Sequence, residues 1–152
     1  MRLRLIAVGR LKPGPLQELQ RGYAARIRWP LEIREVEERR KLPPAELKER
    51  EGALLLAELS DDAVAIALDA RGKPLTSEAF AAQLAAWRDA DADIAFLIGG
   101  AEGLGDAVRR RADRVLSLGA MTWPHFLVRG MLLEQIYRAQ QILAGHPYHR
   151  AD

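Results

Sequence analysis

The order of hydrophobic and polar positions divides the chain into short strands that alternate with helices. Segments 2–8 and 31–36 alternate between charged and apolar residues, which predicts strands, the second with one wet face. Segments 64–68 and 94–98 are continuous apolar runs, typical of parallel strands buried on both faces. A last strand is predicted over 114–118.

Apolar residues at helical spacing predict a helix after each strand. The predicted ranges are 15–28, 44–59, 77–90, 106–112 and 124–143. Pro15 suits a first helical turn, Thr76 or Ser77 can cap the third helix, and Gly145 ends the last one. Gly72-Lys73-Pro74 is expected to form a turn.

About five strands alternating with five helices indicate an α/β fold, with a mostly parallel sheet and helices on both faces. The length of 152 residues fits one domain, and no repeat, low-complexity stretch or linker divides it. We therefore expect a single domain over residues 1–152.

Composition narrows the possible functions. The chain has no cysteine, which excludes disulfides and thiolate metal sites, and its three histidines make any metal site a poor candidate. A net charge of +2 permits RNA as a partner without demanding it. No run of eighteen apolar residues and no signal peptide are found, so we expect no membrane span and a cytoplasmic protein.

Candidate chemistry gathers where three predicted strands end. Segments 68–74, 98–104 and 118–125 place glycine or other small residues directly after a strand, where α/β sheets bind ligands. A tight turn is the alternative explanation for each segment taken alone. The run Gly-Gly-Ala-Glu-Gly does not have the spacing of a dinucleotide fingerprint, and no P-loop or G-x-S-x-G motif is present.

The whole chain resembles the RlmH-type ribosomal RNA methyltransferases, a minimal branch of the SPOUT superfamily. The resemblance rests on motifs in a fixed order: Leu68-Asp69-x-x-Gly72-Lys73, Leu97-Ile98-Gly99-Gly100-Ala101-Glu102-Gly103, Leu116-Ser117-Leu118, Met121-Thr122-x-Pro124-His125, Leu127-Val128-Arg129, Glu134-Gln135-x-Tyr137-Arg138 and His146-Pro147-Tyr148-His149-Arg150. Each motif is weak alone, and together they are specific.

The resemblance implies a SPOUT-type fold with a C-terminal trefoil knot. It implies S-adenosylmethionine as cofactor, held by Leu68, Gly100, Gly119, Ala120, Met121, Thr122, Trp123 and Pro124. It also implies a homodimer that methylates N3 of a pseudouridine in helix 69 of 23S rRNA, within the assembled ribosome. Gly119 replaces a common serine, and Trp123 replaces leucine or phenylalanine.

The tail offers groups for the substrate. His149 is our candidate base, since methylation of an imide nitrogen must remove its proton. Tyr148 can stack on a base and Arg150 can pair with phosphate. Arg129 and Arg138 are alternative cations, but nine residues between them make them face different directions.

Some interpretations stay open. His125 is more typical of a capping or packing residue than of a base. Arg109-Arg110-Arg111, with Arg114 nearby, is either an rRNA phosphate contact or a solvated helix face. The segment 124–143 is apolar on several sides, which predicts burial in a homodimer. A non-enzymatic RNA-binding ribosome assembly factor and a tRNA methyltransferase remain the competing functions.

Overall fold

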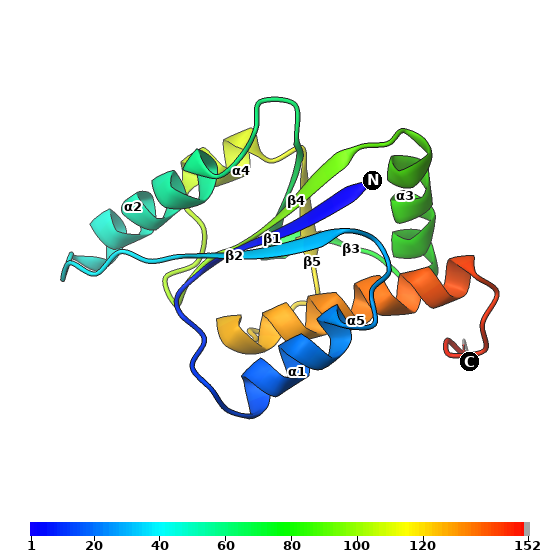
Figure 1. The fold of residues 1–152 in the computed structure, drawn as a ribbon. Helices are drawn as coiled ribbons and strands as arrows, with labels where there is room; N and C mark the ends of the chain where they lie inside the picture. The colour runs from blue at the N-terminus through cyan, green and yellow to red at the C-terminus, as the bar shows by residue number, and fades with distance from the viewer. Residues whose placement is uncertain (151–152) are drawn as a thin grey trace.

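The computed structural model describes residues 1–150, and its centre is one five-stranded parallel sheet (Figure 1). Ala151 and Asp152, the end of the expected domain, lie outside the described residues. The strands run in the order β2-β1-β4-β3-β5. Their bounds are β1 Arg2–Val8, β2 Leu31–Val36, β3 Val64–Pro74, β4 Asp93–Ile98 and β5 Arg114–Ser117.

Five helices cover the two faces of this sheet. They are α1 Pro15–Ala24, α2 Pro44–Ala57, α3 Ser77–Asp89, α4 Asp106–Arg111 and α5 His125–Leu143. Helices α1, α3 and α5 lie on one face, and α2 and α4 lie on the other (Figure 1). The expected α/β class is confirmed, with a sheet that is entirely parallel among the described residues.

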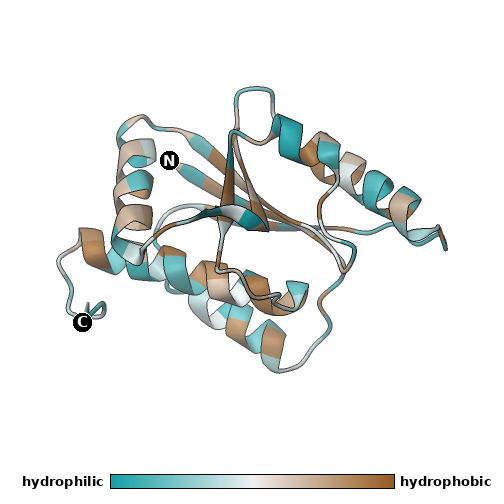
Figure 2. Ribbon diagram, turned by 180° about the vertical axis from the view of Figure 1, so that it is seen from behind, coloured by the Kyte–Doolittle hydropathy of each residue, from teal (hydrophilic) through white to brown (hydrophobic). Residues whose placement is uncertain are grey.

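Two hydrophobic cores explain the continuous apolar runs. Brown stretches in the strands of Figure 2 mark their hydrophobic residues, and successive residues of a strand point to opposite faces of the sheet. In β4, Phe96 packs into the core under α3 and α5, while Leu97 packs into the core under α2 and α4. Strand β2, at the sheet edge, keeps the predicted alternation with no fully buried residue.

Strand β3 differs from the prediction at its second half. The expected turn at Gly72-Lys73-Pro74 is wrong: the strand continues to Pro74 and pairs with β5 a second time, after a register shift between Leu68 and Lys73. A Cβ on Gly72 would lie 2.6 Å from the Val115 carbonyl oxygen. Glycine therefore serves close strand contact here, and not a turn.

Helix ends follow the local signals in most places. Thr76 is the cap of α3, where its side chain accepts a hydrogen bond of 3.1 Å from the Ala79 amide. Gly145 takes a positive φ of 70° after α5, as a C-terminal glycine does. Helix α1, in contrast, ends at Ala24 and not at the predicted residue 28.

The early end of α1 has a tertiary cause. The side chain of Gln140, which is buried on α5, accepts a hydrogen bond of 2.6 Å from the Arg28 amide and donates one of 3.1 Å to the Arg26 carbonyl. These backbone groups would otherwise belong to a longer helix. No helix within residues 1–150 is long and apolar enough to span a membrane.

Candidate cofactor and substrate sites

The middle of β3, where its pairing shifts register, and the loops that follow β4 and β5 surround a cavity of about 630 Å³. It lies at the carboxyl edge of the sheet, where α/β proteins bind ligands. Seven of the eight residues expected to hold the cofactor line it: Leu68, Gly100, Gly119, Met121, Thr122, Trp123 and Pro124. Ala120 belongs to the same loop but does not line the cavity. We call this space the cofactor pocket.

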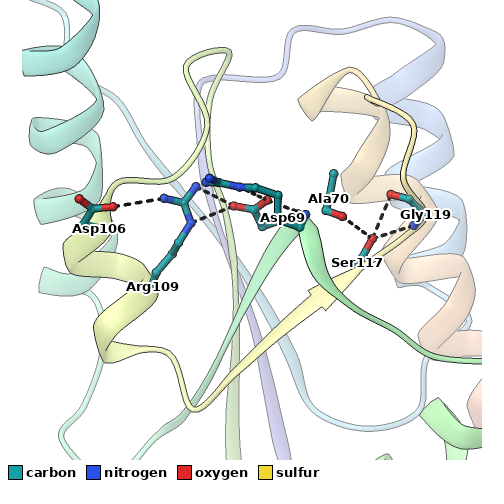
Figure 3. A network of polar contacts seen from close by, with 7 residues as sticks. Asp69, Ala70, Asp106, Arg109, Ser117 and Gly119 are labelled. Atoms are coloured by element: carbon teal, nitrogen blue, oxygen red, sulfur yellow. Dashed lines mark hydrogen bonds and ion pairs between the residues drawn. The ribbon is translucent and has the colours of Figure 1, made fainter.

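The Ser117 side chain links β3 to the loop after β5, and both segments line the pocket (Figure 3). Its hydroxyl accepts a hydrogen bond of 3.0 Å from the Gly119 amide and lies 3.1 Å from the Ala70 carbonyl oxygen. Gly119 has a φ of 118°, a conformation that favours glycine over the serine common in the family. The substitution at Gly119 therefore suits the local backbone.

The loop between β5 and α5 leaves binding groups free. Within residues 1–150, the amides of Ala120, Met121, Thr122 and Trp123 donate no hydrogen bond to another protein group. The residue Met121 is 73% exposed and Trp123 is 40% exposed, although both are large and apolar. Free amides beside unpaired apolar surface are what an adenine ring would use.

The loop after β4 is closely packed. A Cβ on Gly99 would lie 2.8 Å from the Gly103 carbonyl oxygen, and the Gly103 amide donates a hydrogen bond of 3.0 Å to Gly100. Glu51 of α2 lies beside Gly100, and its Oε1 is buried without a partner among the described residues. Burial, with the negative charge of Glu102, raises the pKa of Glu51.

An ion pair stands at the wall of the cofactor pocket (Figure 3). Arg109 donates from Nε and Nη2 to Oδ2 of Asp69, at 3.0 and 2.7 Å. Burial alone would raise the pKa of Asp69, but the Arg71 amide and the Arg109 guanidinium outweigh it and lower this pKa. Asp69 is therefore charged at neutral pH.

His125 is the first residue of α5 and lines the same pocket. Its ring centroid lies 4.3 Å from that of Phe126. Burial, with the nearby charge of Arg129, lowers the pKa of His125, so the ring is neutral at neutral pH. This placement fits the packing role that the sequence favoured.

Arg129 is completely buried in α5 and does not line the pocket. Its guanidinium donates to the carbonyls of Val8 and Gly9, at 3.0 and 2.7 Å, and to Oε2 of Glu35 at 2.6 Å. Burial would raise the pKa of Glu35, but the Leu11 amide and Arg129 outweigh this effect and lower it. The placement supports a structural role for Arg129, because its charge is already engaged inside the chain.

The tail forms a second polar group, which we call the tail cluster: Glu78, Glu134, Arg138, Tyr148 and His149. Oε1 of Glu134 accepts from Nε and Nη2 of Arg138, at 3.0 and 2.7 Å, and from the Tyr148 hydroxyl at 3.0 Å. His149 lies between Arg138, at 3.1 Å, and Glu78, at 2.7 Å. Burial, then the Glu134 contact, raises the pKa of Tyr148 to about 12.

The structure thus divides the predicted site residues into separate groups. The tail cluster brings together the candidate base His149 and two of the predicted substrate contacts, Arg138 and Tyr148, whereas Arg150 is exposed beyond it. None of the tail residues lines the cofactor pocket in its own chain. The three arginines of the basic run 109–111 differ in their surroundings. Arg109 and Arg111 are paired with carboxylates, whereas Arg110 is exposed.

Two residues of the pocket were not assigned to it from the sequence. Lys48 comes from α2, and Arg109, for which the sequence offered only an rRNA contact or a solvated helix face, comes from α4. The position of Asp69 at the end of a continuous apolar run was the one sequence signal for this charged part of the pocket. Within residues 1–150, no group of three or more histidine, aspartate or glutamate side chains is arranged to hold a metal ion.

A parallel sheet with small-residue loops around a cavity at its carboxyl edge defines a class, the α/β proteins with a strand-end ligand pocket. The family follows from sequence comparison. A family model described as predicted SPOUT methyltransferase matches residues 1–149. The chain belongs to the SPOUT methyltransferase family.

Curated relatives are similar over their full length. The chain is 62% identical to a Rhodospirillum centenum protein over 99% of this chain and 100% of that one. It is 55% identical to a Paramagnetospirillum magneticum protein over 99% of each. Both relatives are named ribosomal RNA large subunit methyltransferase H.

Solved structures share the fold at low identity. A putative methylase family protein from Neisseria gonorrhoeae aligns over 99% of this chain and 87% of its own, with a TM-score of 0.59 and 14% identity. A SpoU methyltransferase from Streptomyces viridochromogenes, solved with AdoMet, aligns over 93% of this chain and 58% of its own, with a TM-score of 0.50 and 18% identity.

Proposed function

We propose that this chain is an S-adenosylmethionine-dependent methyltransferase of large-subunit rRNA that methylates N3 of a pseudouridine in helix 69. The observation that carries the proposal is the cofactor pocket, where seven of eight expected residues meet around one cavity. The names of the relatives at 62% and 55% identity support rRNA as the substrate. The whole chain 1–152 acts as one domain, in the cytoplasm.

The pocket fits the proposed cofactor chemically. Trp123 and Met121 provide apolar surface for adenine, and the free amides of 120–123 provide donors for its nitrogen acceptors. The SpoU structure with AdoMet and a Legionella pneumophila structure with SAM support this cofactor for the fold. When bound, the cofactor would supply the methyl group.

The chain's own residues must orient the acceptor nitrogen and take up its proton. His149 remains our candidate base, with Tyr148, Arg138 and Arg150 as substrate contacts. Because Arg129 is buried and bonded to the carbonyls of Val8 and Gly9, we assign it to fixing the start of α5, whose residues His125 and Val128 line the pocket. Since His149 lies in the tail cluster and not in its own pocket, we propose that it serves the pocket of a second subunit in a homodimer.

Most of the apolar surface of α5, from which the sequence predicted a homodimer, is covered within one chain. Its apolar residues pack against α1, α3 and the sheet, so burial within one chain explains much of the composition of α5. A second cavity of about 580 Å³ lies beside α1, α3 and α5 and shares Leu116, Leu118 and Gly119 with the cofactor pocket. Because the two cavities adjoin, a partner subunit that binds over the second cavity would also reach the cofactor pocket, which supports a site shared between subunits.

Subunit complementation tests the shared site. A His149→Ala subunit keeps its pocket, and a Gly99→Ala subunit keeps its tail. If each tail serves the partner, a mixed dimer of the two variants regains one working site, so methyl transfer should return at a cofactor concentration too low to load the Gly99→Ala pocket. A dimer with no regained activity would place the tail in its own site, and a monomeric mass by light scattering would reject the dimer.

We also propose that the C-terminal half forms the trefoil knot typical of the SPOUT fold. The match of residues 1–149 to the SPOUT methyltransferase family supports this topology. Stretching the unfolded chain by its two ends should stop short of the full contour length, because a tightened knot retains residues. Extension to the full length would reject the knot.

Methyl transfer to ribosomes tests the function itself. Ribosomes from a strain that lacks the modification should accept labelled methyl groups, and mass spectrometry should place them on one pseudouridine. Fully modified ribosomes are the control and should accept none. Ribosome binding without transfer, together with no calorimetric binding of S-adenosylmethionine, would favour the assembly factor. Transfer to free tRNA would favour the third candidate.

A further inference from the structure

The cofactor pocket has a charged side that adenine does not need. Five charged residues line it, from three different elements and the loop after β4: Lys48, Asp69, Arg71, Glu102 and Arg109. The apolar residues Met121 and Trp123 come instead from the loop before α5. A ligand that needs only an adenosine site would leave the charged side unused.

The ion pair of Asp69 and Arg109 is the most ordered part of this side. Two donors of Arg109, Nε and Nη2, bind Oδ2 of Asp69. Oδ1 of Asp69 accepts a hydrogen bond of 2.9 Å from the Arg71 amide. The Asp69 side chain is 12% exposed and that of Arg109 is 27% exposed. The pair is therefore positioned by the fold, yet solvent still reaches it.

Arg109 retains binding capacity. Its Nη1 makes one long contact of 3.5 Å, to Asp106, and the Asp106 side chain is 86% exposed. A guanidinium offers five N–H donors in a planar fork that suits a carboxylate. An incoming carboxylate can thus replace the Asp106 contact without breaking the Asp69 pair.

We propose that Asp69 and Arg109 form the subsite for the amino-acid end of the cofactor, with Arg109 receiving the α-carboxylate and Asp69 the α-ammonium. This inference rests on the proposed use of S-adenosylmethionine. A zwitterion carries two opposite charges on neighbouring atoms, and the ion pair presents two opposite charges side by side at the pocket wall. Binding then leaves neither protein charge without a counter-charge.

Ligands that differ only at this end test the proposal. S-adenosylhomocysteine and 5′-methylthioadenosine share the adenosine and the thioether, but the second lacks the amino-acid group. In Arg109→Met, calorimetry should give an affinity for S-adenosylhomocysteine about tenfold weaker, as for loss of one charge-assisted contact. The affinity for 5′-methylthioadenosine should stay within about twofold.

Arg110→Met is the matched control. It removes the same charge from the next position of α4, where the side chain is exposed and lies outside the pocket. This variant should bind both ligands as the unchanged protein does. Arg109→Lys keeps the charge but not the fork, and should recover only part of the selectivity.

The outcomes separate this inference from the proposed function. Equal weakening of both ligands in Arg109→Met would make the pair a structural tie between β3 and α4 and overturn the subsite. Unchanged binding of both would overturn it as well. If the unchanged protein binds neither adenosyl ligand, the proposed function itself fails. Circular dichroism and a thermal midpoint for each variant confirm that the compared proteins are folded.

Discussion

The two halves of α5 use arginine in opposite ways. Arg129, in the first half, is fully buried and bonded to two backbone carbonyls and Glu35. Arg138, in the second half, is partly exposed and bonded to the side chains of Glu134 and His149. The sequence predicted both as substrate contacts, because nothing in the local pattern separates them.

The partners of each arginine decide how rigidly each half of α5 is held. The Val8 carbonyl cannot move away from Arg129 without moving β1, so the first half of α5 is fixed to the sheet. Side-chain partners around Arg138 can exchange for others at low cost, because partly exposed ion pairs contribute little to stability. The second half is therefore held less rigidly than the first.

The largest effect should come from Arg129→Met. Removing the buried guanidinium leaves the carbonyls of Val8 and Gly9 without its hydrogen bonds and Glu35 without its cationic partner, so the free energy of unfolding should fall by about 3 kcal/mol. Urea denaturation measures the loss. Arg138→Met is the matched control and should lose less than about 1 kcal/mol. Equal losses would remove the contrast between the two halves.

A smaller effect is expected at the glycine loop. In Gly99→Ala, the added Cβ would meet the Gly103 carbonyl oxygen at 2.8 Å, so the loop must shift and the cofactor should bind at least about tenfold more weakly. Calorimetry measures the affinity. Gly22→Ala is the control, since its Cβ meets nothing within 4 Å on α1. Normal affinity in Gly99→Ala would separate this loop from the pocket.

The tail cluster should respond more weakly still. Glu134→Gln weakens the shared acceptor of Arg138 and Tyr148, and should lower the free energy of unfolding by about 1 kcal/mol. Cofactor affinity should not change, because Glu134 does not line the cofactor pocket. Glu49→Gln, an exposed change on α2, is the control and should have no effect on either quantity. Weaker cofactor binding in Glu134→Gln would show that the tail cluster affects the cofactor pocket, and would contradict the separate roles of the two halves of α5.

The smallest effect is the ionisation of Tyr148, whose pKa is raised to about 12 by burial and by Glu134. A tyrosine with a raised pKa contributes its stabilisation below its ordinary pKa of 10.0 and loses it as pH rises toward the raised value. Ultraviolet difference titration against Tyr148→Phe should find this late ionisation. In Glu134→Gln it should move to lower pH, while ionisation near pH 10 in the unchanged protein would contradict the tail contact.

The pocket follows a general rule of parallel sheets, and the tail follows none. Gly100 and Gly119 come after β4 and β5, and Leu68 lies in β3 just before its register shift; parallel strands bring their carboxyl ends to one edge whatever the details of packing. These three segments therefore had to meet. The tail has no such rule, and its contact with Glu78 joins positions 71 residues apart.

The sequence by itself determined the α/β class, the order of strands and helices, and the edge that carries the pocket, because hydrophobic period and strand direction are local properties. Four features came from the tertiary structure alone: Arg129 is buried, Asp69 binds Arg109, β3 continues past Gly72, and α1 ends at Ala24 because Gln140 binds the backbone that follows. Each depends on a partner from a distant segment, and a local pattern contains no information about that partner.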